Sequence, residues 1–311
     1  MKKSNSLSRL WASLHLKCCA GIVFLMLFVC LPLCAYAEVR VVATLSTLGA
    51  IVKEVGGPLV QVETMALPTQ DPHFVDPRPD YILKLSRADL LVYNGLELEI
   101  GWLPPVQKGA RNNKVLDGGS GALDASQFIQ PMNVPKQKVD RSQGDIHALG
   151  NPHYLYSLPC VVRVAKGVAD KLAALDPANA ATYQSRYESF KARADQMIEK
   201  ARVRFSDKSG AQKRIVAYHD SMVYLFDWLG LEQMATVEAK PGIAPSPSQI
   251  SALITKMRAE KPEWIVQEVW QPRSASQKIA EMTGAKLVIL PVFPDKDEAL
   301  LAFFERMLAV F

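Results

Sequence analysis

A pattern of strand, helix, strand, helix and strand occurs twice in this chain, and it constrains the fold more than any other feature. The first copy runs from an apolar strand predicted at 39–45 to a strand predicted at 90–93. The second copy runs from residues 214–218 to residues 264–269, and a proline-rich loop follows the second strand of each copy. Alternating strands and helices are typical of parallel sheets covered by helices, so the sequence predicts two similar, Rossmann-like α/β lobes.

Local signals place the elements inside each copy. In the first copy we expect Ser46 to cap a helix that ends at Gly56, because serine is a preferred capping residue and glycine a common terminator. In the second copy a helix is predicted at 220–229, and a strand is predicted at 235–239. The two copies therefore align element by element in pattern, although their residues differ.

A long helix is predicted between the two copies. Residues 178–205 contain no Gly or Pro, and apolar residues such as Tyr183, Phe190 and Ala194 recur at intervals of three and four. At a rise of ~1.5 Å per residue such a helix is roughly 40 Å long, which suits a rigid connection between lobes. The predicted division is a leader at 1–37, an N-terminal lobe at 38–175, a linking helix at 176–206 and a C-terminal lobe at 207–311.

The first 37 residues have the features of an export signal. A basic stretch without acidic residues precedes an apolar run at 18–33, which is too short for a stable membrane span. The small-x-small sequence at 35–37 predicts cleavage before Glu38 and a periplasmic mature protein. The alternative is lipid anchoring at Cys34, but the bulky Leu33 before it departs from the small residue that lipoprotein signals prefer.

Charge and cysteine content exclude several classes of protein. The formal net charge of +5 falls to +1 without the leader's four basic residues, Lys2, Lys3, Arg9 and Lys17. A nearly neutral body argues against nucleic-acid binding, which requires a basic surface. Four of the five cysteines also lie in the leader, so Cys160 alone remains and no internal disulfide is expected. We expect a monomer.

Three histidines are the candidate functional residues. His73 follows the second strand of the first copy, and His219 directly follows the first strand of the second copy. Ligands of parallel sheets bind at the carboxyl ends of strands, so these residues should meet in the crevice between lobes, together with Glu268 at another strand end. His153 precedes a helix after a polar loop at 134–150, and strand order does not fix its position. Imidazole is the commonest side-chain ligand of transition metals, so the sequence predicts a metal site.

Each histidine also has an ordinary structural interpretation. A single histidine beside a proline is more often a turn or capping residue than a ligand, and these spacings lack the short pattern of a zinc finger. His147, inside the polar loop, is interpreted as a loop residue. Glu268 could instead pair with a nearby arginine or lysine. The metal hypothesis therefore depends on the three histidines acting together.

The arrangement of motifs resembles the metal-specific solute-binding proteins of ABC importers, the family that binds zinc and manganese. The resemblance implies that His73, His153 and His219 bind a divalent metal ion between two lobes bridged by a long helix. It also implies that the protein delivers the ion to a membrane permease. The motifs that carry the resemblance are Asp71-Pro72-His73, Gly150-Asn151-Pro152-His153-Tyr154, Tyr218-His219-Asp220, residues 241–247 and residues 284–290.

The chain departs from this family at the fourth ligand. Many relatives carry an aspartate after the strand that here ends at Leu290, whereas this chain has Pro291. Glu268, at the end of a neighbouring strand, is the predicted fourth ligand, and Asp295 on the next loop and a water molecule are the alternatives. The histidine-rich acidic loop of zinc-specific relatives is absent.

Ligand chemistry favours zinc as the bound ion. Three imidazoles with at most one carboxylate suit Zn²⁺, whereas Mn²⁺ prefers more oxygen ligands. Two alternatives stay open at this point. A secreted zinc-dependent hydrolase or hydratase could use the same three histidines with water at the open position and Glu268 as the base. A binder of an organic solute would instead need aromatic and arginine side chains, and Trp102, Trp270 and Arg273 form no cluster in the sequence.

Overall fold

The computed structural model describes residues 38–137, 147–207, 209–238 and 242–311. Residues 38–311 form one compact unit. The predicted export signal and Cys34 lie outside the described residues, as does the middle of the polar loop. Within the described ranges, no helix combines the length and the apolar character that crossing a bilayer requires.

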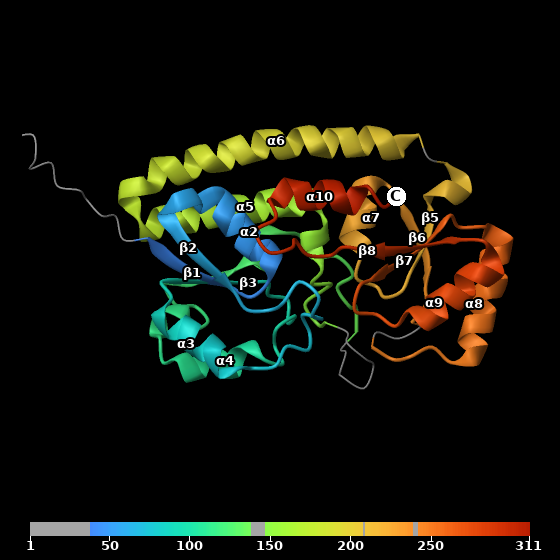
Figure 1. The fold of residues 1–311 in the computed structure, drawn as a ribbon, viewed down its shortest axis with the longest axis horizontal. Coiled ribbons are helices and arrows are strands. Elements are labelled where there is room, and N and C mark those ends of the chain that lie inside the picture. The colour runs from blue at the N-terminus through green and yellow to red at the C-terminus, as the bar shows by residue number, and fades with distance from the viewer. Residues whose placement is uncertain (1–37, 138–146, 208, 239–241) are drawn as a thin grey trace, which may run out of the picture. The chain divides into compact units, whose positions relative to one another are not determined.

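The described chain contains two four-stranded sheets, and every pair of neighbouring strands is parallel (Figure 1). The strand orders are β2-β1-β3-β4 and β6-β5-β7-β8, so the second half of the chain repeats the topology of the first half. This confirms the prediction of two α/β lobes. The strands are β1 (Val39–Ala43), β2 (Val60–Thr64), β3 (Leu90–Tyr93), β4 (Ala122–Asp124), β5 (Arg214–Ala217), β6 (Glu232–Thr236), β7 (Trp264–Glu268) and β8 (Lys286–Leu290).

The first strand of each copy lies in the middle of its sheet. Val41 of β1 pairs with Val62 on one side and with Leu90 on the other. The chain passes from this central strand to β2 on one side and later places β3 on the opposite side. The loops therefore diverge at the carboxyl end of the central strand and leave a crevice there. The crevice position is therefore a consequence of strand order, and it is the place where the predicted site residues follow their strands.

Helices cover both sheets and begin close to where the sequence places them. Two predictions need correction, one about a helix cap and one about the start of a strand. Ser46 is the first residue of its helix and makes no capping bond, since the capping position belongs to Leu45. Strand β6 begins at Glu232, before the predicted Ala235, and its pairing with β5 has an irregularity between Ile215 and Val216. The helices are α2 (Ser46–Gly56), α3 (Pro79–Arg87), α4 (Leu103–Ala110), α5 (Leu158–Leu175), α6 (Ala180–Ser206), α7 (Val223–Leu229), α8 (Pro247–Glu260), α9 (Arg273–Thr283) and α10 (Leu300–Leu308).

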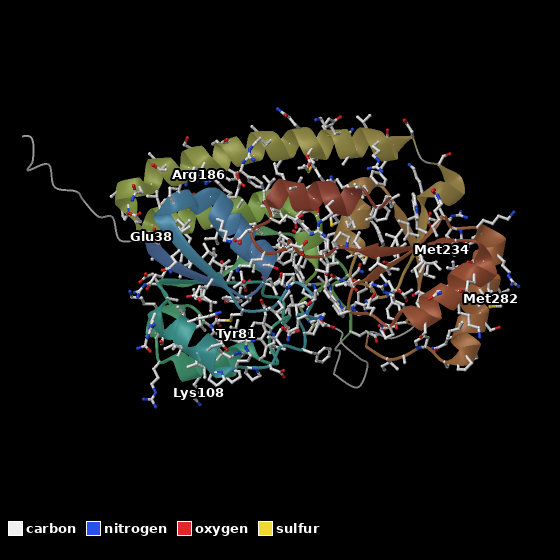
Figure 2. The ribbon with its side chains drawn as sticks, viewed as in Figure 1. Glu38, Tyr81, Lys108, Arg186, Met234 and Met282 are labelled. Carbon is white, nitrogen blue, oxygen red and sulfur yellow. The ribbon has the colours of Figure 1, made fainter. Side chains whose placement is uncertain are left out.

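Helix α6 is the long helix that the sequence predicts, and it runs along α5 (Figure 1). Its apolar stripe is buried, as shown by Tyr183, Phe190 and Ala194. Arg186, labelled on this helix in Figure 2, donates hydrogen bonds to the carbonyl oxygens of Val55 (3.1 Å) and Glu54 (2.8 Å). These bonds satisfy carbonyl groups at the end of α2 that have no partner within that helix.

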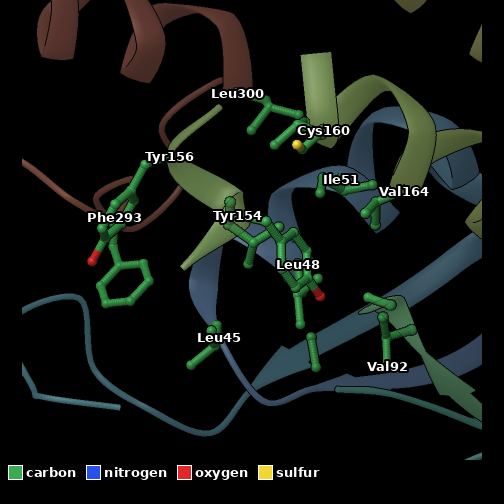
Figure 3. Packing of buried hydrophobic residues seen from close by; sticks show 14 of the residues in the cluster. Leu45, Leu48, Ile51, Val92, Tyr154, Tyr156, Cys160, Val164, Phe293 and Leu300 are labelled. Atoms are coloured by element: carbon green, nitrogen blue, oxygen red, sulfur yellow. The ribbon is translucent and has the colours of Figure 1, made fainter. Parts of the chain in front are cut away.

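The last helix of the chain returns to the first lobe. Leu300 and Phe304 of α10 belong to the same buried cluster as Leu48 and Ile51 of α2, and Figure 3 shows Leu300, Leu48 and Ile51 from close by. Arg204 of α6 donates a hydrogen bond to the carbonyl oxygen of Leu308, 3.1 Å away. One apolar core therefore spans residues of both sheets, while a smaller cluster lies within the second lobe. The lobe boundaries given above stay predictions.

The close packing of α5 gives a test of this fold. Gly167 lies in α5, and a Cβ atom there would stand 2.2 Å from the ring of Phe128. Gly→Ala inside a helix ordinarily stabilises a protein by roughly 0.5–1 kcal/mol. At Gly167 the clash should reverse the sign, because overpacking costs about 1–3 kcal/mol. Urea unfolding of Gly167→Ala, with Gly109→Ala in α4 as the matched control that meets only the flexible end of Ile82, measures this difference.

Candidate metal centre

His73 lies in a turn that fixes both its backbone and its ring. The Asp71 Oδ1 atom accepts the backbone N–H of His73 at 3.0 Å and the ring Nδ1–H at 2.7 Å. This double contact assigns the proton to Nδ1 and leaves the Nε2 lone pair available for a metal. Burial raises the pKa of Asp71, but the hydrogen bond and the charge of His73 outweigh it and hold that pKa below its usual value.

His153 lies in a second turn of the same construction. The Asn151 Oδ1 atom stands 3.0 Å from both the backbone nitrogen and the ring Nδ1 of His153. Asp71-Pro72-His73 and Asn151-Pro152-His153 thus share one arrangement, in which an Asx side chain holds the histidine two residues later. Both turns present an Nε2 atom whose direction is set by the neighbouring acceptor.

Each of these turns is tied to the first lobe through its proline carbonyl. The indole Nε1–H of Trp102 donates to the carbonyl of Pro72 at 2.9 Å. The side-chain amide of Asn94 donates to the carbonyl of Pro152, also at 2.9 Å. These bonds position both histidines against the loop that follows β3.

The carboxyl group of Glu99 holds that loop in turn. It is only 3% exposed, and it accepts hydrogen bonds from the Thr44 hydroxyl (2.7 Å) and from the backbone N–H groups of Asn94 (2.7 Å) and Gly95 (3.1 Å). Burial raises the pKa of Glu99 to about 7, although these three donors oppose the shift. The carboxyl group of Glu99 therefore fixes the loop to which the turns of both histidines are bonded.

His219 directly follows β5 and brings a ligand from the second lobe. Its Nδ1 atom lies 3.3 Å from the Glu238 Oε2 atom, which again leaves Nε2 free. Burial works to lower the pKa of His219, but the bond to Glu238 and the charges of Glu268 and Glu238 raise it above its usual value. The pKa of His153 is lowered well below its usual value, first by burial and then by the charges of the other histidines, so His153 is neutral and able to bind a metal.

The structure brings the three predicted histidines together from both lobes. Ring centroids are 5.2 Å apart for His73 and His153, 5.8 Å for His153 and His219, and 6.5 Å for His73 and His219. His147 joins them, with its ring centroid 5.2 Å from that of His73 and its Nε2 atom 3.2 Å from the His73 Nε2 atom. Sequence reasoning interpreted His147 as a loop residue, and its position shortly before His153 was the only signal that could have drawn attention to it.

These distances describe a site that is close to complete. A tetrahedral ion with bonds of ~2.1 Å separates two ligand nitrogens by about 3.4 Å and two ring centroids by about 5 Å. His147 and His153 meet this requirement relative to His73, whereas His219 lies farther out. Accordingly, within the ranges that the structure describes, no three acidic, histidine or cysteine side chains already stand at ligand distances around one point. To close the group, the His219 ring would have to approach His73, and the His147 and His153 rings, whose centroids are 6.3 Å apart, would also have to approach each other.

Glu268 and Asp295, the two acidic candidates for the fourth ligand, have different surroundings. Glu268 is 2% exposed, and its two oxygens accept bonds from the Tyr156 hydroxyl (3.3 Å) and from the side-chain amide of Gln271. Burial raises the pKa of Glu268, and the positive charge of His219 opposes this shift. Asp295 is exposed and forms an ion pair with Arg306 at 3.4 Å.

Two α/β lobes with imidazoles gathered beyond their strand ends define a protein that binds a metal ion as a solute. Residues 41–310 match a family model described as zinc-uptake complex component A, periplasmic. The chain belongs to this family, whose members are metal-binding components of ABC transporters and not enzymes. The resemblance stated from the sequence is thereby confirmed, and the hydrolase alternative is set aside.

Curated relatives agree on the class of protein but differ in the metal that they name. The chain is 25% identical over 252 residues to the iron ABC transporter substrate-binding lipoprotein MtsA of Streptococcus pyogenes serotype M1, covering 79% of this chain and 77% of the relative. It is 28% identical over 229 residues to the manganese ABC transporter substrate-binding lipoprotein PsaA of Streptococcus anginosus, covering 72% and 70%.

Solved structures share the fold. A crystal structure of ZnuA superposes with a TM-score of 0.73 at 22% identity, covering 88% of this chain and 98% of that chain. The cadmium-bound periplasmic metal binding protein of Candidatus Liberibacter asiaticus superposes with a TM-score of 0.72 at 23% identity and the same coverage. The two-lobed architecture is therefore that of known metal-binding proteins.

The pKa of Glu99 predicts how stability depends on pH. The folded state holds the proton of Glu99 up to about pH 7, whereas an unfolded chain releases it near 4.5. The unfolded state therefore binds fewer protons between these values, and stability should fall as pH rises through this window, by about 3 kcal/mol in total. Urea unfolding at pH 5 and pH 8 should show this loss in the wild type. The loss should be much smaller in Glu99→Gln, and an equal loss in both proteins would contradict the assignment.

Proposed function

We propose that this protein captures zinc with four imidazoles, those of His73, His147, His153 and His219. The observation that carries the proposal is the 3.2 Å separation of the His73 and His147 Nε2 atoms, which matches the edge of a tetrahedral zinc site. Hydrogen bonds at Nδ1 of the other two histidines leave their Nε2 atoms free for the same ion. Four nitrogen ligands complete a closed tetrahedron without water.

His147 is a better candidate for the fourth ligand than Glu268, which the sequence alone favoured. Both oxygens of Glu268 already accept hydrogen bonds, from Tyr156 and from Gln271, and ligation would require at least one to be given up. The Nε2 atoms of His147 and His73 form a hydrogen bond of 3.2 Å, and a metal ion would replace the proton that these two atoms share. Glu268 then acts on the site through the charge that it presents to His219.

Nitrogen ligands favour zinc over manganese, one of the two metals named for the curated relatives. Imidazole suits zinc, copper, nickel and iron, whereas manganese is held best by carboxylate, carbonyl and water oxygens. A site whose four ligands are imidazoles should therefore discriminate against Mn²⁺. Affinity alone also favours Cu²⁺, so the protein would bind copper in vitro whatever its cargo in the cell.

Export and delivery to a permease complete the proposed function. The leader predicts that the site works outside the cytoplasm, either as a soluble periplasmic protein or anchored at Cys34, as the lipoprotein names of the relatives suggest. Exposed apolar side chains occur next to site residues, such as Phe74 beside His73 and Val269 beside Glu268. Such residues at the mouth of a site suit contact with a protein partner. Mass spectrometry of the mature N-terminus distinguishes cleavage after Ala37 from lipidation of Cys34.

The ligand set predicts the outcome of two single substitutions. His147→Ala should weaken Zn²⁺ binding by more than 100-fold, because it removes a ligand. Glu268→Gln should weaken binding by no more than the ~10–100-fold typical of residues around a metal's ligands. Competition titration with a chromophoric chelator measures both, with Asp295→Asn as the unchanged control. A larger loss in Glu268→Gln than in His147→Ala would reverse the assignment.

Metal binding should stabilise a fold that already exists without the metal. The apolar core shared by the two lobes contains no site histidine, so the metal-free protein should unfold cooperatively. Linkage adds roughly 4 kcal/mol when free zinc exceeds Kd by 1,000-fold. Calorimetry with and without zinc tests both statements. A metal-free protein that unfolds without a cooperative transition would disprove the first of them.

A further inference from the structure

The side chain of Glu97 reaches the segment that carries His147. Its Oε2 atom accepts a hydrogen bond from the backbone N–H of Ala148 at 2.9 Å. That N–H belongs to the peptide bond that joins Ala148 to His147. A contact at this peptide therefore constrains where the chain places the His147 ring.

Backbone hydrogen bonds hold the residues that directly follow His147. The N–H of Gly150 donates to the carbonyl of His147 at 3.2 Å, and the N–H of Asn151 donates to the carbonyl of Met132 at 2.8 Å. Gly150 has a φ of 110°, and a Cβ atom there would lie 2.9 Å from the Cβ of Pro131. His147 is thus held between a tight turn that follows it and the carboxylate of Glu97.

The loop that presents Glu97 has an unusual backbone. Gly95, Leu96 and Glu97 have φ values of 78°, 50° and 64°, so two residues with side chains adopt the left-handed conformation in succession. This conformation is unfavourable for residues other than glycine and persists where the surroundings require it. Glu99 fixes the start of this loop by accepting the N–H of Gly95. The backbone that Glu99 organises is thereby also the one that carries Glu97.

We infer that Glu97 is a positioning residue that holds His147 in place as the fourth ligand, and so sets the preference of the site for zinc over manganese. This inference rests on the proposed function. Without the bond from Ala148 to Glu97, the segment loses a tie to the first lobe, and the position of the His147 ring beside His73 becomes less restricted. The remaining three imidazoles would then bind an ion with an open position, which an oxygen ligand from water could fill.

The experiment compares Glu97→Ala, Glu97→Gln, His147→Ala and the double variant Glu97→Ala/His147→Ala. Competition titration gives the affinities for Zn²⁺ and Mn²⁺, and the visible absorption of bound Co²⁺ reports the coordination geometry. We expect Glu97→Ala to weaken zinc binding about tenfold, at the lower end of such effects. Its cobalt spectrum should shift toward that of His147→Ala. In the double variant, Glu97→Ala should not lower the zinc affinity below that of His147→Ala alone.

Two further variants separate positioning from other causes. Glu97→Gln should retain wild-type zinc affinity, because an amide oxygen can also accept the Ala148 N–H. Asp117→Ala is the matched control: Asp117 lines the same cavity of about 280 Å³ as Glu97, but its hydrogen bond is to the Tyr93 hydroxyl at 3.2 Å. This control removes an equal charge and should leave the affinity and the cobalt spectrum unchanged. Thermal unfolding of each metal-free variant checks that the fold is retained.

The outcomes distinguish the inference from the function on which it rests. Wild-type affinity and spectrum in Glu97→Ala, with strong loss in His147→Ala, would overturn the role of Glu97 and leave the zinc site standing. An equal loss from Glu97→Ala in the presence and absence of His147 would show that Glu97 acts without His147, and would also overturn it. Unchanged zinc binding in His147→Ala would instead remove His147 from the proposed ligand set, and the inference with it.

Discussion

The single apolar core that spans both sheets is the constraint on which the metal site depends. Because α10 packs on α2 and Arg204 of α6 bonds to the end of α10, the two lobes are joined by more than a connecting helix. Large relative motion of the lobes would expose buried residues such as Phe303 and Phe304 to water. Closure around an ion is therefore expected to involve shifts of loops and of the histidine rings, with little movement of the sheets.

Topology made much of this arrangement predictable from the sequence. The duplicated pattern gives two parallel sheets, and parallel sheets gather their loops at strand ends, so His73 and His219 could be placed before any coordinates were known. His153 could not be placed by strand order, because it follows a loop and precedes a helix. The Asx-Pro-His sequence occurs at both His73 and His153. The sequence alone does not show that Asp71 and Asn151 each hold the ring of the histidine two residues later.

His147 and Glu97 show where sequence reasoning ends. His147 has no strand, turn motif or periodicity to mark it, and its approach to His73 depends on contacts between segments far apart in the chain. Leu96 and Glu97 both have a left-handed backbone conformation. Neither residue type indicates that conformation, since glycine, asparagine and aspartate are the residues that usually adopt it. The start of β6 was also misplaced, because its irregular pairing with β5 disturbs the alternation that marks a strand.

In the proposed site, negative charge behind the imidazoles would allow neutral ligands to hold a dication away from water. A buried divalent ion is costly unless negative charge lies near it, and four imidazoles supply none. Asp71 and Glu238 supply it from the far side of the rings, since each accepts the Nδ1–H of a histidine whose Nε2 faces the ion. Such an acceptor raises the basicity of the imidazole and fixes its tautomer. The two carboxylates together offset the charge of the ion while the positions around it stay nitrogen. The outer carboxylates would thus add to the binding strength that the imidazoles supply, while the imidazoles set the metal preference.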